Sequence, residues 1–536
     1  MKKLVVAEKT SVATSIAAVL GAKSEKGGCY ENDSYVISWC VGHLLTSAEP
    51  EAYDEKFKTP WKIEVLPILP EVFKYVPIER SKNQFDTLKG LFARADISSV
   101  VNACDAGREG ELIFRLVYDY CKCKKPLERL WISSLEESAI QEGFKNLHSG
   151  NDYANLHRAA LGRQHADWIV GMNLSRLYSC LYRGRVNIGR VQTPTLAMIV
   201  ARELKIKNFV KEPFYTVEIT GGGFTSSREK LSDETLAESI RQKCDGTTAT
   251  IQEVTKQEKS ESPPKLYDLT ALQRDANRLF GYTAADTLKI AQNLYEQKIL
   301  TYPRTDSRFL TEDMAAGILP LVKQTVEMLK ELPMPISMSE YVGEGLNLPF
   351  GAVVGNVNTK PITSNAKVTD HHAIIPTPTT ASVSIASLPK DAKDILLMVC
   401  IRLVSAISEK HLYSETVITT ECQGEIFIAK GKTVKLEGWK AIERIFADYC
   451  CRKKDNKTEP APLPDVTQGQ QIQVTASTKE GFTQPPKHYT EDIRYKGGKR
   501  KPSKISWQRL IRSGFRRFSS IQRKGGQYVK LVGIVA

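Results

Sequence analysis

Three short apolar runs, each followed by a segment with helical periodicity, fill the first 150 residues of the chain. The apolar runs cover residues 3–7, 98–105 and 129–134. The helical patterns follow them directly, and Thr10 or Ser11 is expected to cap the first helix. Repeated strand-then-helix units are typical of a parallel sheet covered by helices. The sequence therefore predicts a parallel α/β domain over residues 1–150.

The rest of the chain predicts helices that are separated by two β segments. Residues 154–203 have helical periodicity, broken at 183–194 by a loop with glycines and a proline. Alternation of apolar and polar residues at 215–254 and at 415–429 predicts antiparallel strands. A mainly helical stretch at 269–403 lies between them. One β domain with an inserted helical domain explains this order, and a last β pair is expected around Gln471.

The length of the chain, 536 residues, exceeds what one hydrophobic core usually holds. The expected fold is therefore multidomain α/β and α+β. The expected domains are 1–150 (parallel α/β), 151–214 (helical), 215–268 (first β part), 269–408 (helical insert), 409–484 (second β part) and 485–536 (basic C-terminal segment).

Composition favours a globular protein without a membrane segment. Hydrophobic residues make up 41% of the chain, and no apolar run approaches the roughly 18 residues that cross a membrane. The N-terminus does not resemble a secretory signal, so a cytoplasmic location is expected. The 11 cysteines are scattered without a Cys-x-x-Cys pair, which favours free thiols over disulfides or a zinc site.

The net charge of +14 comes almost wholly from the C-terminal end. Between Ile493 and Ala536 there are 13 Lys and Arg residues and no Asp or Glu. Because the preceding residues are nearly neutral in sum, the overall charge is weak evidence for a nucleic-acid partner. Any nucleic-acid surface in the body of the protein must be a local groove.

Acidic side chains follow two of the predicted parallel strands. Glu8 ends the first apolar run, Asp105 ends the second, and Glu109 and Glu111 come soon after. Open α/β sheets bind ligands at the carboxyl ends of their strands. Converging carboxylates suit a hard cation such as Mg²⁺, although a single acidic residue at a strand end more often caps a helix or faces solvent.

Val6-Ala-Glu8-Lys9, together with Asp105-Ala-Gly-Arg-Glu-Gly-Glu-Leu-Ile113, resembles the Toprim domain of topoisomerases, bacterial primases and some nucleases. That pattern usually has Asp-x-Asp where this chain has Asp105-Ala-Gly107. The resemblance implies Glu8 and Asp105 as Mg²⁺ ligands and Glu109 as a third. Gly107 makes a tightly held second metal ion less expected.

Leu300-Thr-Tyr302-Pro-Arg-Thr-Asp-Ser307 carries the strongest chemical signal. An isolated tyrosine is usually structural, but Pro303 fixes the backbone beside it and Arg304 offers a planar fork that matches a phosphate. The string resembles the active-site sequence of type IA DNA topoisomerases of the topoisomerase III kind. Further resemblances extend this match over residues 1 to about 490. They are Asp268–Gly281, Ala166–Arg176, Gly189–Pro194 and Asp370–Pro376.

The resemblance implies a torus in which a Toprim domain, helical DNA-binding and gate domains, and an interrupted β domain enclose the DNA. It implies that Tyr302 attacks a phosphate of single-stranded DNA, forms a 5′-phosphotyrosine and later reverses the step. No nucleotide is required, and no phosphate-binding Gly-x-x-x-x-Gly-Lys-Ser/Thr loop is present in the sequence. Because Tyr302 and Glu8 belong to different predicted domains, the site must form across a domain interface.

Besides the metal ligands, this resemblance implies two sets of residues. The catalytic candidates are Tyr302, Glu8, Lys9, Arg304 and His371. Lys9 and Arg304 would hold the reacting phosphate, Glu8 would alternate between metal ligand and proton donor, and His371 would contact the phosphate or orient its neighbours. The DNA-binding candidates are Arg163, Asp167, Arg176, Asn187, Ile188, Gly189, Arg190, Val191, Gln192, Thr305 and Ser307. Thr305 and Ser307 could instead hold the loop.

The resemblance stops after Asp492, where a basic run replaces the helices expected of the family. The run is either a DNA-binding tail or the altered end of a truncated product, and the second is preferred because the match stops inside a domain. Two alternatives to a complete topoisomerase therefore stay open: a catalytically impaired single-strand-binding remnant, and a Toprim nuclease or primase. The expected substrate is single-stranded or negatively supercoiled DNA, with a helicase as candidate partner and the protein itself a monomer.

Overall fold

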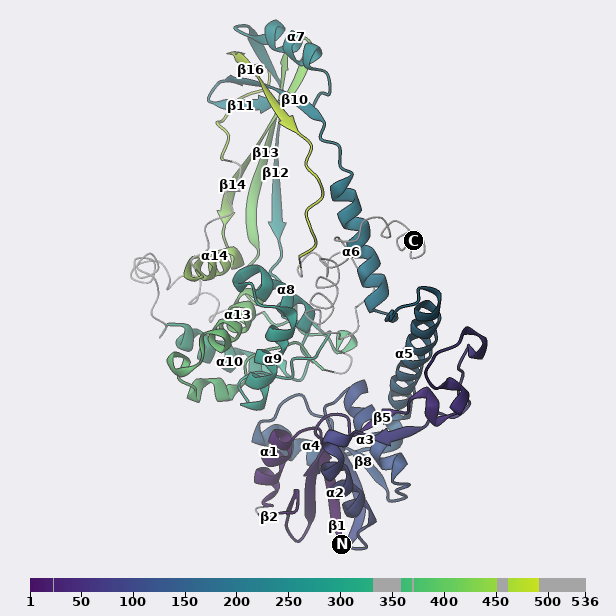
Figure 1. The fold of residues 1–536 in the computed structure, drawn as a ribbon. Coiled ribbons are helices and arrows are strands. Elements are labelled where there is room, and N and C mark those ends of the chain that lie inside the picture. Colours follow the sequence, from purple (N-terminus) through teal and green to yellow (C-terminus); the bar gives the residue numbers. More distant parts are fainter. Residues whose placement is uncertain (23, 331–357, 369–370, 451–460, 491–536) are drawn as a thin grey trace.

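The structure is a computed structural model that describes residues 1–22, 24–330, 358–368, 371–450 and 461–490 (Figure 1). The basic run after Asp492 and the first residue of the histidine motif, Asp370, lie outside the described residues. Among the described helices, none is long and apolar enough to cross a membrane. Every described cysteine is a free thiol, as the sequence predicted.

The N-terminal sheet has seven strands in the order β2-β3-β4-β1-β7-β8-β9. Its centre is parallel and comprises β4 (Tyr35–Trp39), β1 (Lys2–Ala7), β7 (Ile97–Ala103) and β8 (Leu127–Arg129). Its edges are antiparallel, with β2 (Ser24–Lys26) and β3 (Cys29–Glu31) on one side and β9 (His148–Ser149) on the other. The predicted parallel sheet is therefore confirmed at its centre, but the prediction was wrong for the edges, whose strands are too short to show alternation.

Helices cover both faces of this sheet, so the central strands are buried on both sides and are continuously apolar. One face packs on α2 (Lys82–Ala93) and α3 (Arg108–Tyr120), and the other on α1 (Thr10–Leu20) and α4 (Glu137–Lys145). The predicted cap of the first helix was wrong. Lys9 is the N-cap residue without a side-chain cap hydrogen bond, because Thr10 already lies inside the helix. A two-stranded sheet of β5 (Leu45–Ser47) and β6 (Tyr75–Pro77) adjoins the domain.

Two long helices leave this domain. They are α5 (Ala154–Leu181) and α6 (Gln192–Lys207). The loop predicted at 183–194 lies between them but ends earlier, because α6 already begins at Gln192. They lead to a second seven-stranded sheet with the order β15-β12-β13-β14-β11-β10-β16. Its strands are β10 (Pro213–Gly221), β11 (Phe224–Ser227), β12 (Thr248–Glu261), β13 (His411–Cys422), β14 (Glu425–Leu436), β15 (Gln471–Gln473) and β16 (Thr475–Phe482).

The second sheet joins strands from both sides of the helical insert, because β12 pairs with β13 across 150 or more positions of sequence. The predicted interruption is thus confirmed. Two details differ from the prediction. A helix, α7 (Glu234–Cys244), lies within the first β segment. The last two strands do not pair with each other, since β15 pairs with β12 and β16 pairs with β10.

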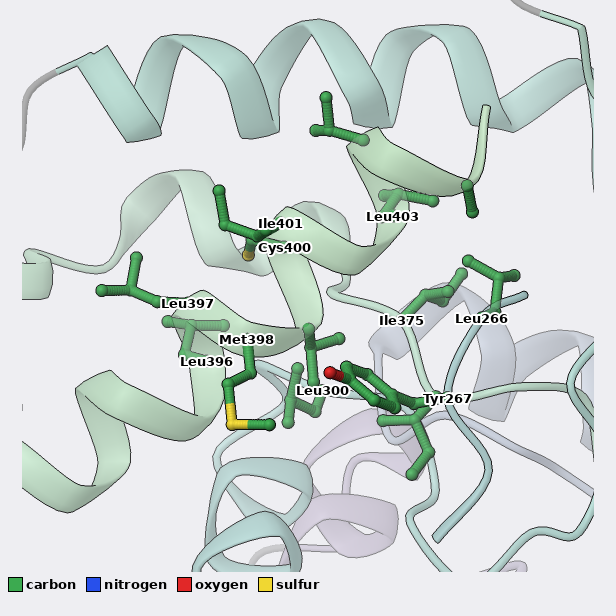
Figure 2. Packing of buried hydrophobic residues seen from close by; sticks show 14 of the residues in the cluster. Leu266, Tyr267, Leu300, Ile375, Leu396, Leu397, Met398, Cys400, Ile401 and Leu403 are labelled. Atoms are coloured by element: carbon green, nitrogen blue, oxygen red, sulfur yellow. The ribbon is translucent and has the colours of Figure 1, made fainter. Parts of the chain in front are cut away.

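The helical insert has its own core, formed by α8 (Leu269–Phe280), α9 (Ala284–Glu296), α10 (Ala315–Lys330) and α13 (Lys390–Ala406). Figure 2 shows Leu396 and Met398 of α13 beside Leu300, which comes two residues before Tyr302. A further helix, α14 (Trp439–Tyr449), follows β14 and adds Ile442 and Phe446 to this core.

The elements follow a closed circuit (Figure 1). From the N-terminal domain, α5 and α6 rise along one side to the upper part of the second sheet. Strands β12, β13 and β14 return along the other side to the helical insert, which meets the N-terminal domain again. The circuit agrees with the torus that the resemblance implied, and its closure brings the Tyr302 segment to the strand ends of the first sheet.

Candidate active site

Two carboxylates meet at the carboxyl edge of the first sheet. Glu8 follows β1 and Asp105 follows β7, and these strands are neighbours in register, with Ala7 opposite Ala103. Both side chains are buried, at 5% and 9% exposure. The sequence placed both residues at strand ends, and strand pairing brings them together.

Tyr302 reaches these carboxylates from the helical insert. Its hydroxyl donates a hydrogen bond to Oδ2 of Asp105 at 3.0 Å. Nη1 of Arg304 lies 3.6 Å from Oδ2 of Asp105 and 3.9 Å from Oε1 of Glu8. The predicted assembly across an interface is thus present, with Tyr302 and Arg304 on one side and Glu8 and Asp105 on the other.

Burial and mutual repulsion dominate the electrostatics of this cluster. Burial, and then the charge of Asp105, raises the pKa of Glu8 to about 7, against the opposing effects of Arg304 and Lys9. Burial, and then Asp105, also raises the pKa of the Tyr302 phenol well above its usual value. The nucleophile is therefore a neutral phenol at pH 7 in this arrangement.

The two carboxylates fit a divalent cation. Oε2 of Glu8 is buried and has no hydrogen-bond partner among the described residues, and buried carboxylates held together in this way are stabilised by a bound cation. Two protein carboxylates suffice for Mg²⁺, which keeps several waters. Within the described part of the chain, no group of three His, Cys, Asp or Glu side chains could hold a metal ion.

Glu109, the expected third ligand, is not part of this cluster. Its side chain is 39% exposed and lies 3.6 Å from His43 and 3.6 Å from Arg163. The helix α3 begins at Arg108 and directs Glu109 toward α5 instead. Gly107 has nothing within 4 Å of the position that a Cβ would take, so no neighbouring side chain fills the place of the missing carboxylate.

Lys9, a candidate for holding phosphate, is paired with a carboxylate in this structure. Its ammonium group donates to Oε1 of Glu296, at the end of α9, at 2.7 Å. Ser11 donates to Oε2 of the same residue at 3.1 Å. Lys9 therefore bridges the interface between the N-terminal domain and the insert.

His371 lies beside the nucleophile. It is 3% exposed, and its ring centre is 4.4 Å from that of Tyr302. Its Nε2 hydrogen-bonds the carbonyl of Ala106, and its Nδ1 lies 2.8 Å from the hydroxyl of Ser133. Of the two roles considered, orientation of neighbours is the one supported by these contacts.

Thr305 and Ser307 hold the loop in this structure, which is the second of the two roles considered for them, and their assignment to DNA binding stays a prediction. Both are buried, at 6% and 4% exposure. Thr305 Oγ1 donates to the carbonyl of His371 at 2.9 Å, and Ser307 Oγ donates to that of Lys367 at 3.0 Å. Short hydroxyl side chains next to a tight turn often bond to nearby backbone, which the motif alone did not reveal.

Arg163, Asp167 and Arg190 form an ion-pair chain on α5 and the following loop. Arg163 lies 3.9 Å from Asp167, and Arg190 lies 3.2 Å from Asp167. Their side chains are 28%, 47% and 41% exposed, so they are accessible to a phosphate backbone.

Arg176 differs from the other candidates on α5. It is 3% exposed, donates to the carbonyl of Phe57 at 2.6 Å and pairs with Glu51 at 3.3 Å. Its guanidinium also lies over Trp61. Its two terminal nitrogens are used within the protein in this structure, and its assignment to DNA binding stays a prediction.

The loop between α5 and α6 is anchored to both helices. The backbone of Ile188 bonds the hydroxyl of Ser175, and the N–H of Gly189 donates to Thr193. The remaining candidates are Asn187, which is exposed, Val191, which is the N-cap of α6, and Gln192, which is its first residue.

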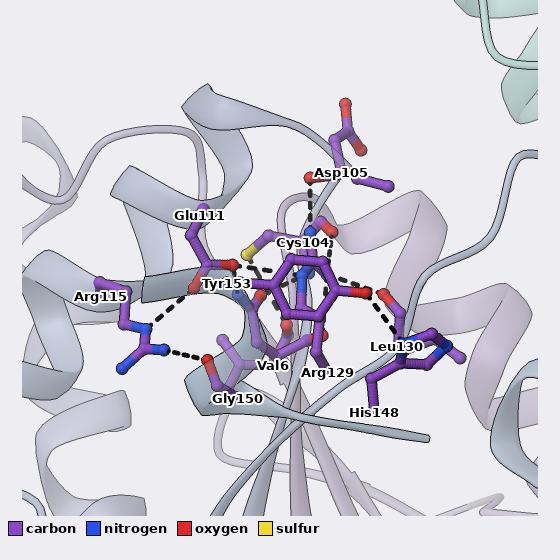
Figure 3. Close-up of polar contacts among 12 residues, drawn as sticks. Val6, Cys104, Asp105, Glu111, Arg115, Arg129, Leu130, His148, Gly150 and Tyr153 are labelled. Carbon is purple, nitrogen blue, oxygen red and sulfur yellow. Dashed lines mark hydrogen bonds and ion pairs between the residues drawn. The ribbon is translucent and has the colours of Figure 1, made fainter. Parts of the chain in front are cut away.

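Sequence reasoning missed Ser133, Glu296 and Arg129. Arg129 is wholly buried beneath Asp105 and donates to the carbonyl of that residue at 2.9 Å, next to Glu111 (Figure 3). The signal for Ser133 was available in part, since it follows the third parallel strand as Glu8 and Asp105 follow the first two. No local sequence pattern indicated Glu296.

Two family models match most of the chain. Residues 151–493 match the model of a DNA topoisomerase family, and residues 3–135 match that of the Toprim domain. Proteins named DNA topoisomerase 3 from Bacillus licheniformis and Bacillus subtilis are each 38% identical over 499 residues, which cover 91% of this chain and 66% of the relative. The chain thus spans just under two thirds of the length of these relatives.

The fold has a solved counterpart. The structure of full-length topoisomerase I from Thermotoga maritima matches 96% of this chain and 78% of that chain, with a TM-score of 0.66 and 20% identity. This likeness concerns the fold, whereas the two family models cover the helical and β parts and the N-terminal sheet domain. The chain therefore belongs to the type IA DNA topoisomerase family, with its Toprim domain at residues 3–135.

Proposed function

We propose that this protein cleaves one strand of single-stranded DNA through Tyr302, passes another strand through the break and reseals it without ATP. The observation that carries this proposal is the hydrogen bond from the Tyr302 hydroxyl to Asp105, made across the interface and flanked by Arg304. A structural tyrosine does not need a buried carboxylate pair and a guanidinium from two separate domains. This combination suits phosphoryl transfer, which depends on positioning and charge stabilisation.

In the proposed reaction, the Tyr302 oxygen attacks a backbone phosphorus and the 3′ oxygen of the neighbouring nucleotide leaves. Asp105 accepts the hydrogen bond of the phenol, so it is placed to receive the phenolic proton. Glu8, with its pKa raised to about 7, can deliver a proton to the departing 3′ oxygen and take it back on resealing. One phosphodiester replaces another, so no nucleotide is consumed.

Arg304 stabilises the negative charge that gathers on the phosphate. Its Nη1 lies within 4 Å of both carboxylates, and its buried Nε has no hydrogen-bond partner among the described residues. That free donor is available to a phosphate oxygen. Mg²⁺, when held by Glu8 and Asp105, would add positive charge at the phosphate; the metal role of Glu8 competes with its role as a proton carrier.

Strand passage requires the insert to separate from the Toprim domain while both DNA ends stay held. Polar contacts cross this interface, including Lys9 to Glu296 and Thr379 to Glu136 at 3.0 Å. Polar contacts can be exchanged for water, which lowers the cost of opening this part of the interface. The substrate we propose is single-stranded or negatively supercoiled DNA, bound along the surface that carries Arg163 and Arg190, with a helicase as a source of single strands.

The test uses an oligonucleotide with Mg²⁺, followed by denaturation. With the label at the 3′ end, the label should migrate with the protein, because Tyr302 keeps the 5′ phosphate of that fragment. With the label at the 5′ end, a shorter free strand should appear. Tyr302→Phe should abolish both products. Tyr295→Phe, whose ring centre is 5.3 Å from that of Tyr302, is the matched control and should keep both.

Each alternative predicts a different outcome. A Toprim nuclease would still produce short free strands with Tyr302→Phe and no protein-linked label. A single-strand-binding remnant would retard the oligonucleotide without cleaving it. Relaxation of a negatively supercoiled plasmid then separates cleavage from the complete cycle.

A further inference from the structure

Ser133 occupies a third strand end at the edge that carries the active site. It comes four residues after the end of β8, which pairs with β7 in parallel. Glu8, Asp105 and Ser133 therefore follow three neighbouring parallel strands. The first two are the carboxylates of the candidate active site, whereas Ser133 takes no part in the proposed proton transfers.

Both polar groups of Ser133 point across the interface. Its carbonyl accepts a hydrogen bond from the backbone N–H of Tyr302 at 3.0 Å. Its hydroxyl lies 2.8 Å from Nδ1 of His371. One residue of the Toprim domain thus contacts both the nucleophile and the histidine that packs against it. The neighbouring Ser134 differs, because its hydroxyl accepts from the N–H of Glu136 within the Toprim domain at 3.2 Å.

The direction of the His371 bonds follows from their partners. Nε2 faces the carbonyl of Ala106, which can only accept, so Nε2 carries a proton. In the neutral ring Nδ1 is then an acceptor, and the hydroxyl of Ser133 donates to it. Ser133 and Ala106 together select one tautomer of His371 and one orientation of its ring.

His371 transmits this orientation to the nucleophile. One side of its ring faces Tyr302, with a centre-to-centre distance of 4.4 Å. The ring also stacks on Trp131 of the Toprim domain, 6.0 Å away and inclined by 11°. A tilt of the His371 ring would therefore alter the packing against the Tyr302 phenol.

We propose that Ser133 is a positioning residue that sets the Tyr302 backbone and the His371 ring each time the gate closes. The inference rests on the proposed function. Reactive groups must lie within about 0.5 Å of the productive geometry. Because the interface between the insert and the Toprim domain opens in every proposed cycle, this geometry must be restored at each closure. Ser133 can restore it, because it bonds to the Tyr302 backbone and to the His371 ring at the same time.

Ser133→Ala is the test, with Ser134→Ala as the matched control. Ser133→Ala removes the hydroxyl and keeps the carbonyl contact to Tyr302. The rate of protein-linked product in a single turnover, at saturating 3′-labelled oligonucleotide, should fall about tenfold, the effect of one lost hydrogen bond. The dissociation constant of the oligonucleotide and the melting temperature should stay near those of the wild type. Ser134→Ala should cleave at the wild-type rate.

A double variant separates positioning from a general structural effect. If Ser133 acts through His371, the double variant Ser133→Ala/His371→Ala should cleave DNA at the same rate as the single variant His371→Ala, and no more slowly. Wild-type rates in Ser133→Ala, or rate losses that multiply in the double variant, would overturn the proposal. Restoration of the rate by Ser133→Thr, which keeps a hydroxyl, would support it.

A spectroscopic measurement keeps the inference independent of turnover. In ¹⁵N-histidine-labelled protein, with His371 assigned by His371→Gln, the Nδ1 resonance should be that of a hydrogen-bonded acceptor and should shift in Ser133→Ala. An unchanged Nδ1 resonance contradicts the inference. If the wild type forms no covalent product although the resonance shifts, the proposed function fails and the Ser133 contact stands.

Discussion

Replacing Arg129 by methionine removes the charge that lies beneath Asp105. The side chain is fully buried, and its Nε lies 3.2 Å from Oε2 of Glu111. Its two terminal nitrogens donate to backbone carbonyls at 2.7 to 2.9 Å. The four carbonyls belong to Asn102, Cys104, Leu130 and Asp105. Arg129, the last residue of β8, thus stabilises the carboxyl end of the neighbouring strand β7 (Figure 3).

The expected loss of stability follows from the Glu111 carboxylate, which stays buried without the Arg129 charge. Removing one partner of a buried ion pair destabilises by about 3 to 5 kcal/mol, because the other charge stays buried. Glu111 is 1% exposed but keeps two partners, Arg115 at 2.9 Å and Asn102 at 2.9 Å. We therefore expect the lower end of the range, about 3 kcal/mol, in the local free energy of opening.

Hydrogen exchange followed by mass spectrometry measures this locally, which suits a protein of several domains. Since 1.4 kcal/mol corresponds to a factor of ten, amides of β7 should exchange about 100-fold faster in Arg129→Met. Peptides from β12 and β13, in the distant sheet, should exchange as in the wild type and serve as the internal control.

A second substitution tests the cause. Adding Glu111→Gln to Arg129→Met removes the stranded charge, so the double variant should exchange more slowly than Arg129→Met alone. The reasoning is refuted if Arg129→Met leaves β7 exchange within about threefold of the wild type, which corresponds to less than 1 kcal/mol. It is also refuted if the double variant is no better protected than the single one.

Further predictions concern one glycine and one surface carboxylate. A Cβ at Gly110 would lie 2.1 Å from the carbonyl oxygen of Asp105, so Gly110→Ala should displace that residue and abolish the rise in melting temperature on adding Mg²⁺. Gly107→Ala, with open space at its Cβ, should keep the rise; equal behaviour of the two variants would contradict this. Hydrogen bonds from Arg94 lower the pKa of Glu31 to about 2, so Glu31→Gln should cost about 1 kcal/mol at pH 7. Because the native pKa lies below the ordinary 4.5, this stabilisation is complete above that pH and is lost as pH falls toward 2. The melting temperatures of the wild type and Glu31→Gln should therefore converge in acid. A difference that stays constant with pH would contradict a stabilising role of the ionised Glu31.

The sequence alone singled out the residues that meet at the candidate active site. Apolar runs that end at Glu8 and Asp105 are local patterns, and adjacent parallel strands necessarily place their carboxyl ends at one edge. The string around Tyr302 and Arg304 is equally local. Alternation on both sides of a helical stretch likewise predicted the interrupted β domain, because strand periodicity depends on the nearest residues.

Only the tertiary structure decided how individual side chains are used. Arg163 and Arg176 lie on the same helix, yet one is accessible and the other is buried against Phe57, because the fold of a distant segment covers it. Lys9 pairs with Glu296, 287 positions away, a choice that no local pattern contains. The pairing of β15 and β16 was predicted wrongly for the same reason, since the partner of each strand is an edge formed by distant residues. Residue type and spacing thus determined which chemistry this protein carries, and packing between distant segments determined which groups are free to perform it.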